Sequence, residues 1–176
     1  GRWGLEKGKS RNFGHRKGVF VVQNIIKASI KKKIKYLTLY AFSTENWKRP
    51  VKEINFLMNL MSDYLEKNVH KLIKNNIKIN VIGDINKIPF KLKKKLIVIQ
   101  KKTQKNSLIQ VNIALNYGFK DEIIRSFKLI KKKSLKITKK NIEKNLYTKL
   151  IPDPEILIRT GGTNRLSNFL LWQLAY

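Results

Sequence analysis

Short runs of β-branched and aromatic residues alternate with longer amphipathic stretches along the chain. The short runs predict strands over Tyr36 to Phe42, Ile77 to Gly83, Gln110 to Tyr117 and Glu155 to Arg159. Apolar residues at helical spacing predict helices over His15 to Lys33, Pro50 to Asn75, Lys91 to Lys102, Asp121 to Lys132 and Thr138 to Thr148. Strands that alternate with helices favour right-handed βαβ units. We therefore expect a single α/β domain with a mostly parallel central sheet that is flanked by helices and covered on both faces.

The helix expected from Pro50 is apolar over more than half of its circumference. One apolar row holds Ile54, Leu57, Met58, Met61 and Leu65, and a second row holds Phe56, Leu60 and Tyr64. Two interpretations stay open. The helix is buried on two sides, or part of its surface lines a cavity for a hydrocarbon chain.

Composition narrows the choice of protein class. The 176 residues are 42% hydrophobic, which is ample for one core. The chain has no cysteine, which excludes a disulfide framework and a thiolate metal site, and its apolar runs are shorter than the ~20 residues of a membrane-spanning helix. A cytoplasmic protein is the expectation. The net charge of +28 attracts polyanions, but lysines are spread over the whole chain, so we expect no dedicated nucleic-acid surface.

Unusual residues collect directly after the predicted strands. The segments are Ser43 to Trp47, Gly83-Asp84, Asn116 to Gly118, and Arg159-Thr160-Gly161-Gly162. Ligands bind at the carboxyl ends of the strands in open α/β sheets. One edge of the sheet is therefore the predicted functional edge.

The Arg159 to Gly162 segment has the chemistry of a diphosphate site, since a guanidinium binds phosphate with two parallel hydrogen bonds and glycine lets backbone amides approach an anion. A tight turn with a solvent-facing Arg159 is the alternative. Arg165, Ser167 and Asn168 add a second guanidinium and a hydroxyl, and we expect them at the start of another helix, where the dipole favours anions. Together they favour an anion pocket.

A second group of cations lies near the beginning of the chain. Arg2, Arg11 and His15 could meet one diphosphate, although a lone histidine before a helix is more often a surface or capping residue. Arg49 stands just before Pro50, the expected first residue of a helix. Glu53 lies in the first turn of that helix, where a carboxylate that only complements the helix dipole is an equally good interpretation.

Taken together, these motifs resemble the cis-prenyltransferases of the undecaprenyl diphosphate synthase type, the isoprenyl transferases. The resemblance spans the chain and is carried in order by Gly1-Arg2-Trp3, Arg11 to His15, Tyr40 to Pro50, Ile82-Gly83-Asp84, Asn116-Tyr117-Gly118, Ile158 to Gly162 and Arg165 to Gln173. It implies the α/β fold of that family.

The resemblance also implies the reaction and the roles of residues. Isopentenyl diphosphate would be joined to an allylic diphosphate, farnesyl diphosphate being the primer it suggests, to make a polyprenyl lipid carrier. The allylic diphosphate would be bound by Arg2, Trp3, Arg11, His15 and Arg49. Isopentenyl diphosphate would be bound and positioned by Ser43, Asn46, Trp47, Arg159, Arg165 and Ser167, with Asn46 the candidate catalytic residue.

The family pattern extends beyond both ends of this sequence. The family has Met-Asp-Gly-Asn directly before the position of Gly1, and a glutamate, a last strand and an arginine-rich tail after the position of Tyr176. We therefore expect residues 1–176 to be one domain truncated at both ends, without its first and last strands. We expect Mg²⁺ as the cofactor, no metal ligand within this stretch, and no activity from the stretch alone. The resemblance also implies a homodimer and allows peripheral contact with the inner face of the membrane.

Two positions depart from the family pattern, and two other function classes stay open. Thr163 stands where many bacterial members have glutamate, and Phe119 stands where a second glycine is usual, which removes backbone freedom from that loop. A non-catalytic partner subunit of a heteromeric prenyltransferase would keep the fold. A basic nucleic-acid-binding protein would explain the charge, but no familiar binding motif supports it.

Overall fold

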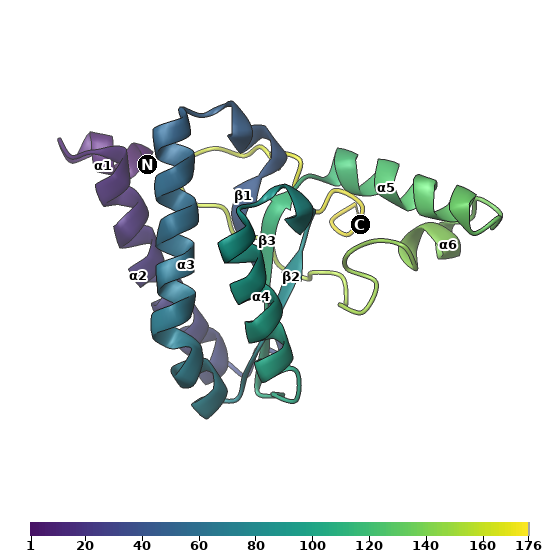
Figure 1. The fold of residues 1–176 in the computed structure, drawn as a ribbon, viewed down its shortest axis with the longest axis horizontal. Helices are drawn as coiled ribbons and strands as arrows, with labels where there is room; N and C mark the ends of the chain where they lie inside the picture. Colours follow the sequence, from purple (N-terminus) through teal and green to yellow (C-terminus); the bar gives the residue numbers. More distant parts are fainter. Residues whose placement is uncertain (176) are drawn as a thin grey trace.

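Three parallel strands form the centre of the part of the chain that the computed structural model describes, residues 1–175 (Figure 1). They are β1 (Tyr36–Ser43), β2 (Ile77–Ile82) and β3 (Ile109–Tyr117), in the order β1-β3-β2. Both pairings with β3 are parallel, which confirms the predicted sheet and its first three strands.

The helices are α1 (Arg2–Glu6), α2 (Arg11–Lys31), α3 (Val51–Lys74), α4 (Phe90–Thr103), α5 (Phe119–Lys132) and α6 (Lys139–Glu143). Two 3₁₀ turns, η1 (Thr44–Lys48) and η2 (Ile85–Lys87), follow β1 and β2. The hydroxyl of Ser10 accepts a hydrogen bond from the amide of Phe13, 3.2 Å away, and so caps α2. Pro50 directly precedes α3 and accounts for its beginning there.

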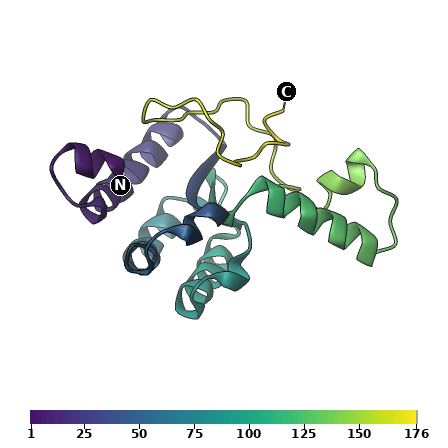
Figure 2. The ribbon, with the colours of Figure 1, turned by 90° about the horizontal axis from the view of Figure 1, so that it is seen from above.

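Alternation along the strands divides the core between the two faces of the sheet. Ile79, Val111 and their neighbours pack against α2, α3 and α4 on one face. Ile82 and Ala114 point to the other face, where Phe169 and other residues of the last turns cover them. Figure 2 shows α3 and α4 on one side of the sheet and the chain after residue 148 on the other.

The prediction of a fourth strand over residues 155–159 is wrong. No backbone hydrogen bond joins this segment to any described strand, and Ile156 and Ile158 are 77% and 83% exposed. A β-branched run becomes a strand only where a neighbouring strand pairs with its backbone. Here none does, and the segment is an extended loop.

Two helical predictions near the end of the chain are also corrected. The helix expected over residues 138–148 ends at Glu143, because the Asn145 side chain bonds back to Asn141 and the Asn145 carbonyl accepts from Arg125. The helix expected from Arg165 is a series of turns, in which Ser167 and Asn168 have φ of 52° and 61°. The argument from a helix dipole at that place therefore fails.

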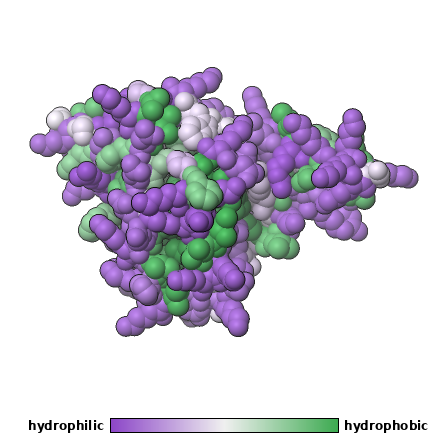
Figure 3. Space-filling view, in the orientation of Figure 1, coloured by the Kyte–Doolittle hydropathy of each residue, from purple (hydrophilic) through white to green (hydrophobic). Residues whose placement is uncertain are grey.

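Figure 3 shows hydrophilic residues spread over the visible face and over the projecting α5, with apolar groups between them. None of the described helices combines the length and the apolar character that crossing a bilayer requires.

Candidate functional site

The end of β1 is shaped by a reciprocal cap. Ser43, the last residue of β1, donates its amide to Asn46 Oδ1 at 3.2 Å, and the Ser43 side chain accepts from the Asn46 amide in return. Asn46 Oδ1 is therefore occupied by the backbone. Within residues 1–175, Asn46 Nδ2 donates no hydrogen bond. This nitrogen can therefore donate to a ligand.

Trp47 is fixed from the neighbouring strand. Its indole Nε1 donates to Asn116 Oδ1 at 2.7 Å, and Asn116 Nδ2 donates to the carbonyl of Asp84 at 2.7 Å. The Trp47 ring also meets Phe42 edge to face, with ring centroids 5.1 Å apart. Asn116, at the end of β3, thus links the ends of all three strands.

A cluster of charged side chains joins α2 to the beginning of α3. Glu53 Oε1 lies 3.1 Å from both His15 Nε2 and an Arg49 guanidinium nitrogen. The Glu53 side chain is only 10% exposed. Burial opposes its ionisation, but the hydrogen bond from His15 and the charge of Arg49 outweigh burial, so the pKa of Glu53 lies below its ordinary value. Burial lowers the pKa of His15, and the hydrogen bond to Glu53 opposes this only in part.

Arg2 and Arg11 complete this cationic cluster. A Cβ placed on Gly1 would lie 3.3 Å from the His15 ring and 3.7 Å from an Arg11 nitrogen, so Arg11 lies beside His15. A Cβ placed on Gly161 would lie 3.6 Å from an Arg2 nitrogen. Arg2 therefore stands where the beginning of the chain meets the Arg-Thr-Gly-Gly segment, far away in sequence.

Trp3 has a different position from the arginines. Its ring stacks on Phe13, with centroids 6.1 Å apart and planes 9° apart, and the residue is 47% exposed. Trp3 therefore packs α1 against α2.

The second predicted anion pocket is organised by Arg159. Its Nε donates to Thr163 Oγ1 at 2.9 Å, and one terminal nitrogen donates to Ser167 Oγ at 2.9 Å and to the carbonyl of Arg165. Arg159 and Ser167 are thus brought together, whereas Arg165 contributes only its backbone to this contact. Thr163, one of the two departures from the family pattern, accepts this hydrogen bond and so supports Arg159 directly.

The Arg159 segment is anchored to β1 through the residues after it. Tyr40 donates its hydroxyl to the carbonyls of Tyr117 and Ser167 at 3.1 and 3.3 Å, and Asn168 donates to Glu45 Oε1 at 2.8 Å. Burial raises the pKa of Tyr40 to about 12, so the hydroxyl stays a donor at neutral pH. These bonds hold the Arg159 segment beside η1.

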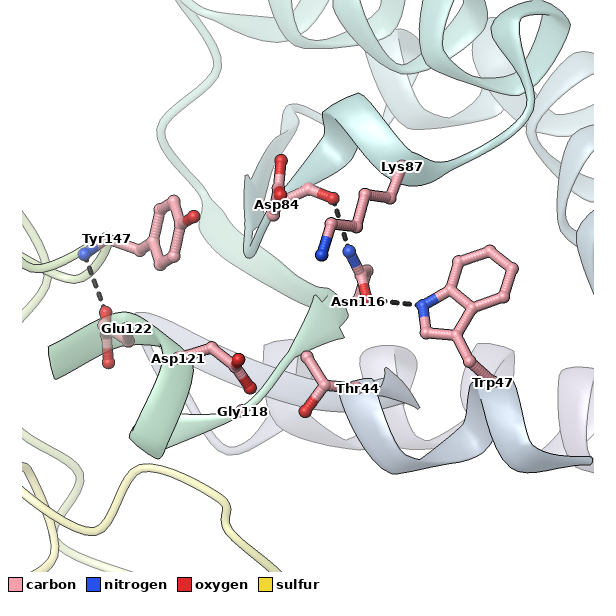
Figure 4. A pocket seen from close by; sticks show the side chains of 9 residues that line it. All are labelled: Thr44, Trp47, Asp84, Lys87, Asn116, Gly118, Asp121, Glu122 and Tyr147. Atoms are coloured by element: carbon pink, nitrogen blue, oxygen red, sulfur yellow. Dashed lines mark hydrogen bonds between the residues drawn. The ribbon is translucent and has the colours of Figure 1, made fainter. Parts of the chain in front are cut away.

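A separate pocket of ≈ 230 Å³ lies at the same edge of the sheet (Figure 4). Its wall is formed by Thr44, Trp47, Asp84, Lys87, Asn116, Gly118, Asp121, Glu122 and Tyr147. It contains Trp47 but no arginine. Three acidic residues against one lysine make it a poor receptor for a diphosphate, so the arginine clusters remain the candidate anion sites.

No group of three or more His, Asp or Glu side chains within residues 1–175 is arranged to hold a metal ion. Asp84 instead accepts from the Asn86 amide at 3.0 Å, and Glu45 accepts from Asn168. Both carboxylates are thus engaged within the protein.

The predicted site residues therefore form three adjoining groups around the end of β1. The cationic cluster holds Arg2, Arg11, His15 and Arg49; the η1 group holds Ser43, Asn46 and Trp47; the Arg159 group holds Arg159, Arg165 and Ser167. Sequence reasoning missed the bridging position of Glu53 and the anchoring roles of Tyr40 and Asn168. For Glu53 the one available signal was its spacing of four residues from Arg49.

Comparison with known proteins places the chain in a family. The family model described as "Putative undecaprenyl diphosphate synthase" matches residues 1–176. The chain is 48% identical to the isoprenyl transferase of Clostridium tetani, covering all of this chain and 72% of that one. It is 44% identical to a ditrans,polycis-undecaprenyl-diphosphate synthase ((2E,6E)-farnesyl-diphosphate specific) of Pasteurella multocida, covering all of this chain and 76% of the relative.

Solved structures give the same result. A probable undecaprenyl diphosphate synthase from Campylobacter jejuni superimposes with a TM-score of 0.84 at 39% identity, covering 91% of this chain and 77% of that one. Lavandulyl diphosphate synthase from Lavandula x intermedia, in complex with dimethylallyl diphosphate, superimposes with a TM-score of 0.92 at 30% identity, covering 98% and 78%. The chain belongs to the undecaprenyl diphosphate synthase family of prenyltransferases.

Proposed function

We propose that this protein elongates cis-prenyl chains by condensing isopentenyl diphosphate with an allylic diphosphate, farnesyl diphosphate being the expected primer. The proposal rests on the meeting of two arginine groups at one strand end, where a Cβ placed on Gly161 would lie 3.6 Å from an Arg2 guanidinium nitrogen. Two adjoining anion sites suit a reaction between two diphosphates. Membership of the family and this geometry favour an enzyme over a non-catalytic partner subunit or a nucleic-acid-binding protein.

The allylic diphosphate is assigned to the cationic cluster. Breaking the allylic carbon–oxygen bond leaves negative charge on the departing diphosphate, which Arg2, Arg11, Arg49 and His15 stabilise. The double bond of isopentenyl diphosphate supplies the electrons of the new carbon–carbon bond, and a proton is lost from the isopentenyl unit. No nucleophile from the protein is needed.

Isopentenyl diphosphate is assigned to the Arg159 group, with Arg165 and Ser167. The η1 group lies between the two sites. Asn46 Nδ2 is free to donate toward the reacting unit, because the Ser43 amide occupies Asn46 Oδ1. Trp47, held by Asn116, keeps η1 in place, and Trp3 keeps α1 on α2. Among these, Asn46 is the candidate catalytic residue.

The proposal includes Mg²⁺, which prefers oxygen ligands and binds diphosphate oxygens readily. Residues 1–176 are proposed to be a single prenyltransferase domain that does not turn over by itself, because the resemblance to the family places the Mg²⁺-binding carboxylates outside this stretch. We also propose that the protein forms a homodimer and is located in the cytoplasm. Peripheral contact with the inner face of the membrane is proposed because the product is a lipid.

The test is incorporation of radiolabelled isopentenyl diphosphate into extractable lipid, with farnesyl diphosphate as primer, by the protein expressed from its whole reading frame. Incorporation that stops when a chelator removes Mg²⁺ is the expected result. Absence of labelled lipid at every Mg²⁺ concentration would refute the function. Labelled lipid in excess chelator would refute only the metal dependence.

A further inference from the structure

Glu53 is an acidic residue within the cationic cluster. Its carboxylate is 10% exposed and accepts hydrogen bonds from His15 and Arg49 through a single oxygen, at 3.1 Å each. A negative charge within a few ångströms of these cations weakens their attraction for a diphosphate. On electrostatic grounds alone, the cluster would bind an anion better without Glu53.

The geometry also does not fit a carboxylate that serves only the helix dipole. Glu53 does lie in the first turn of α3. Its side chain, however, reaches His15 on α2, 38 residues earlier in the chain, and returns to Arg49 at the end of η1. One oxygen atom therefore joins α2, η1 and α3 at the place where the cations converge.

We propose that Glu53 is a positioning residue for the allylic diphosphate site, a role that rests on the proposed function. Its carboxylate fixes the imidazole of His15 and one edge of the Arg49 guanidinium. The remaining N–H groups of Arg49 stay free to form paired hydrogen bonds with phosphate oxygens. Without the carboxylate, the two side chains would repel each other when charged and turn toward solvent.

The positioning role and the purely electrostatic role predict opposite changes in the affinity of Glu53→Gln for diphosphate. Glu53→Gln keeps the size of the side chain but removes its charge, and Glu53→Asp keeps the charge but withdraws the carboxylate by one methylene. If Glu53 positions His15 and Arg49, both variants bind diphosphate more weakly. If Glu53 only opposes the anion, Glu53→Gln binds diphosphate more tightly.

The experiment is calorimetric titration of the whole protein with inorganic diphosphate and, separately, with farnesyl diphosphate. We expect Kd to rise by roughly 10- to 150-fold in Glu53→Gln and Glu53→Asp, the loss typical of a charged hydrogen bond. Glu66→Gln is the matched control, because Glu66 lies on the same helix, is 66% exposed and pairs with Lys95 away from the cluster. Its Kd should stay within about twofold of the unsubstituted protein.

The outcomes separate the two levels of the proposal. Unchanged or tighter binding by Glu53→Gln would overturn the positioning role while leaving the proposed function intact. A protein that binds neither ligand before any substitution would overturn the allylic site itself, and the role of Glu53 with it.

A second readout distinguishes positioning from general loss of structure. The chain has two histidines, and His70 lies exposed on α3, so its NMR signal serves as an internal reference. The charges that act on His15 are those of Glu53, Arg49 and the amino group of Gly1, and Arg11 lies nearby. Since Glu53 favours the imidazolium, Glu53→Gln should lower the pKa of His15 and leave the His70 signal unchanged. A His15 titration identical to that of the unsubstituted protein would contradict the bridge.

Discussion

The two arginine groups of the site are held in different ways. Helices carry two central residues of the cationic cluster and its bridge. Glu53 is buried in the first turn of α3, and His15 lies on α2. The Arg159 group belongs to a loop. Residues 155–159 of this loop make no backbone hydrogen bonds with any described strand, and Ile156 and Ile158 are exposed. Arg159 is instead held by side-chain contacts with Thr163 and Ser167.

This difference indicates where the site is preorganised. Side chains on packed helices lose little further freedom when a ligand binds, whereas an exposed loop must be ordered at that moment. We therefore expect the allylic half to be ready in the free protein and the isopentenyl half to tighten on its ligand. Tyr40 and Asn168 limit the loop's movement, because they bind it to β1 and η1.

The largest expected effect compares two glycines with positive φ, Gly83 directly after β2 and Gly162 in the loop of the Arg159 group. A Cβ on Gly83 (φ 118°) would lie 2.1 Å from the carbonyl oxygen of Leu115, whereas a Cβ on Gly162 (φ 62°) would have nothing within 4 Å. Gly83→Ala should cost about 3–5 kcal/mol, the sum of backbone strain and overpacking. Gly162→Ala should cost about 1 kcal/mol, from the backbone alone. Urea unfolding measures both, and equal losses would mean that the loop is as tightly packed as the strand end.

The next effect separates the two halves by substrate. Arg159→Ala should raise the KM for isopentenyl diphosphate, and Arg49→Ala should raise the KM for the allylic diphosphate. Each rise should be roughly 10- to 150-fold, equivalent to about 1.5–3 kcal/mol for a charged hydrogen bond. Steady-state kinetics with the other substrate saturating provides the measurement. Both variants affecting the same substrate would show that the assignment of the two sites is wrong.

The smallest effect is a pH dependence of stability that belongs to the cationic cluster. The pKa of Glu53 is lowered in the folded protein, so its contribution is present above the unfolded value of about 4.3 and is lost as pH falls through the folded value. The pKa of His15 is also lowered, so stability declines as pH falls below about 6.5. Urea unfolding between pH 7.5 and 3 should show a decline that His15→Asn reduces below about pH 6.5. Glu53→Gln should reduce only the part below about pH 4.3 and, because it lowers the pKa of His15 further, should steepen the part above. An Arg159→Ala profile should keep its shape, because arginine stays charged throughout. If it flattens instead, the pH dependence does not reside in the cluster.

The sequence predicted the elements whose pattern and local signals agree. Strand β3 and helix α3 were found to within a residue or two, because the β-branched run of β3 is bounded by turn residues and Pro50 marks where α3 begins. The segment 155–159 has the same kind of β-branched pattern and failed. Its pattern describes a side-chain preference, and pairing depends on a neighbour that no local pattern contains.

The candidate site was predicted residue by residue but not as a geometry. Arginine, serine and glycine types at strand ends indicated phosphate chemistry before any contact was known. That Asn116 would hold Trp47, or that Thr163 would support Arg159, could not be predicted from spacing alone. These bonds depend on where separate strands and loops end in space.

The sequence by itself thus determined the class of the fold, the edge of the sheet where the candidate site residues gather and the cationic character of that site. These follow from periodicity and residue chemistry, which are local properties. Only the tertiary structure decided that Glu53 bridges His15 and Arg49, and that Gly161 meets Arg2. Both contacts join segments far apart in the chain, and their distances are fixed by how helices and loops pack around β1.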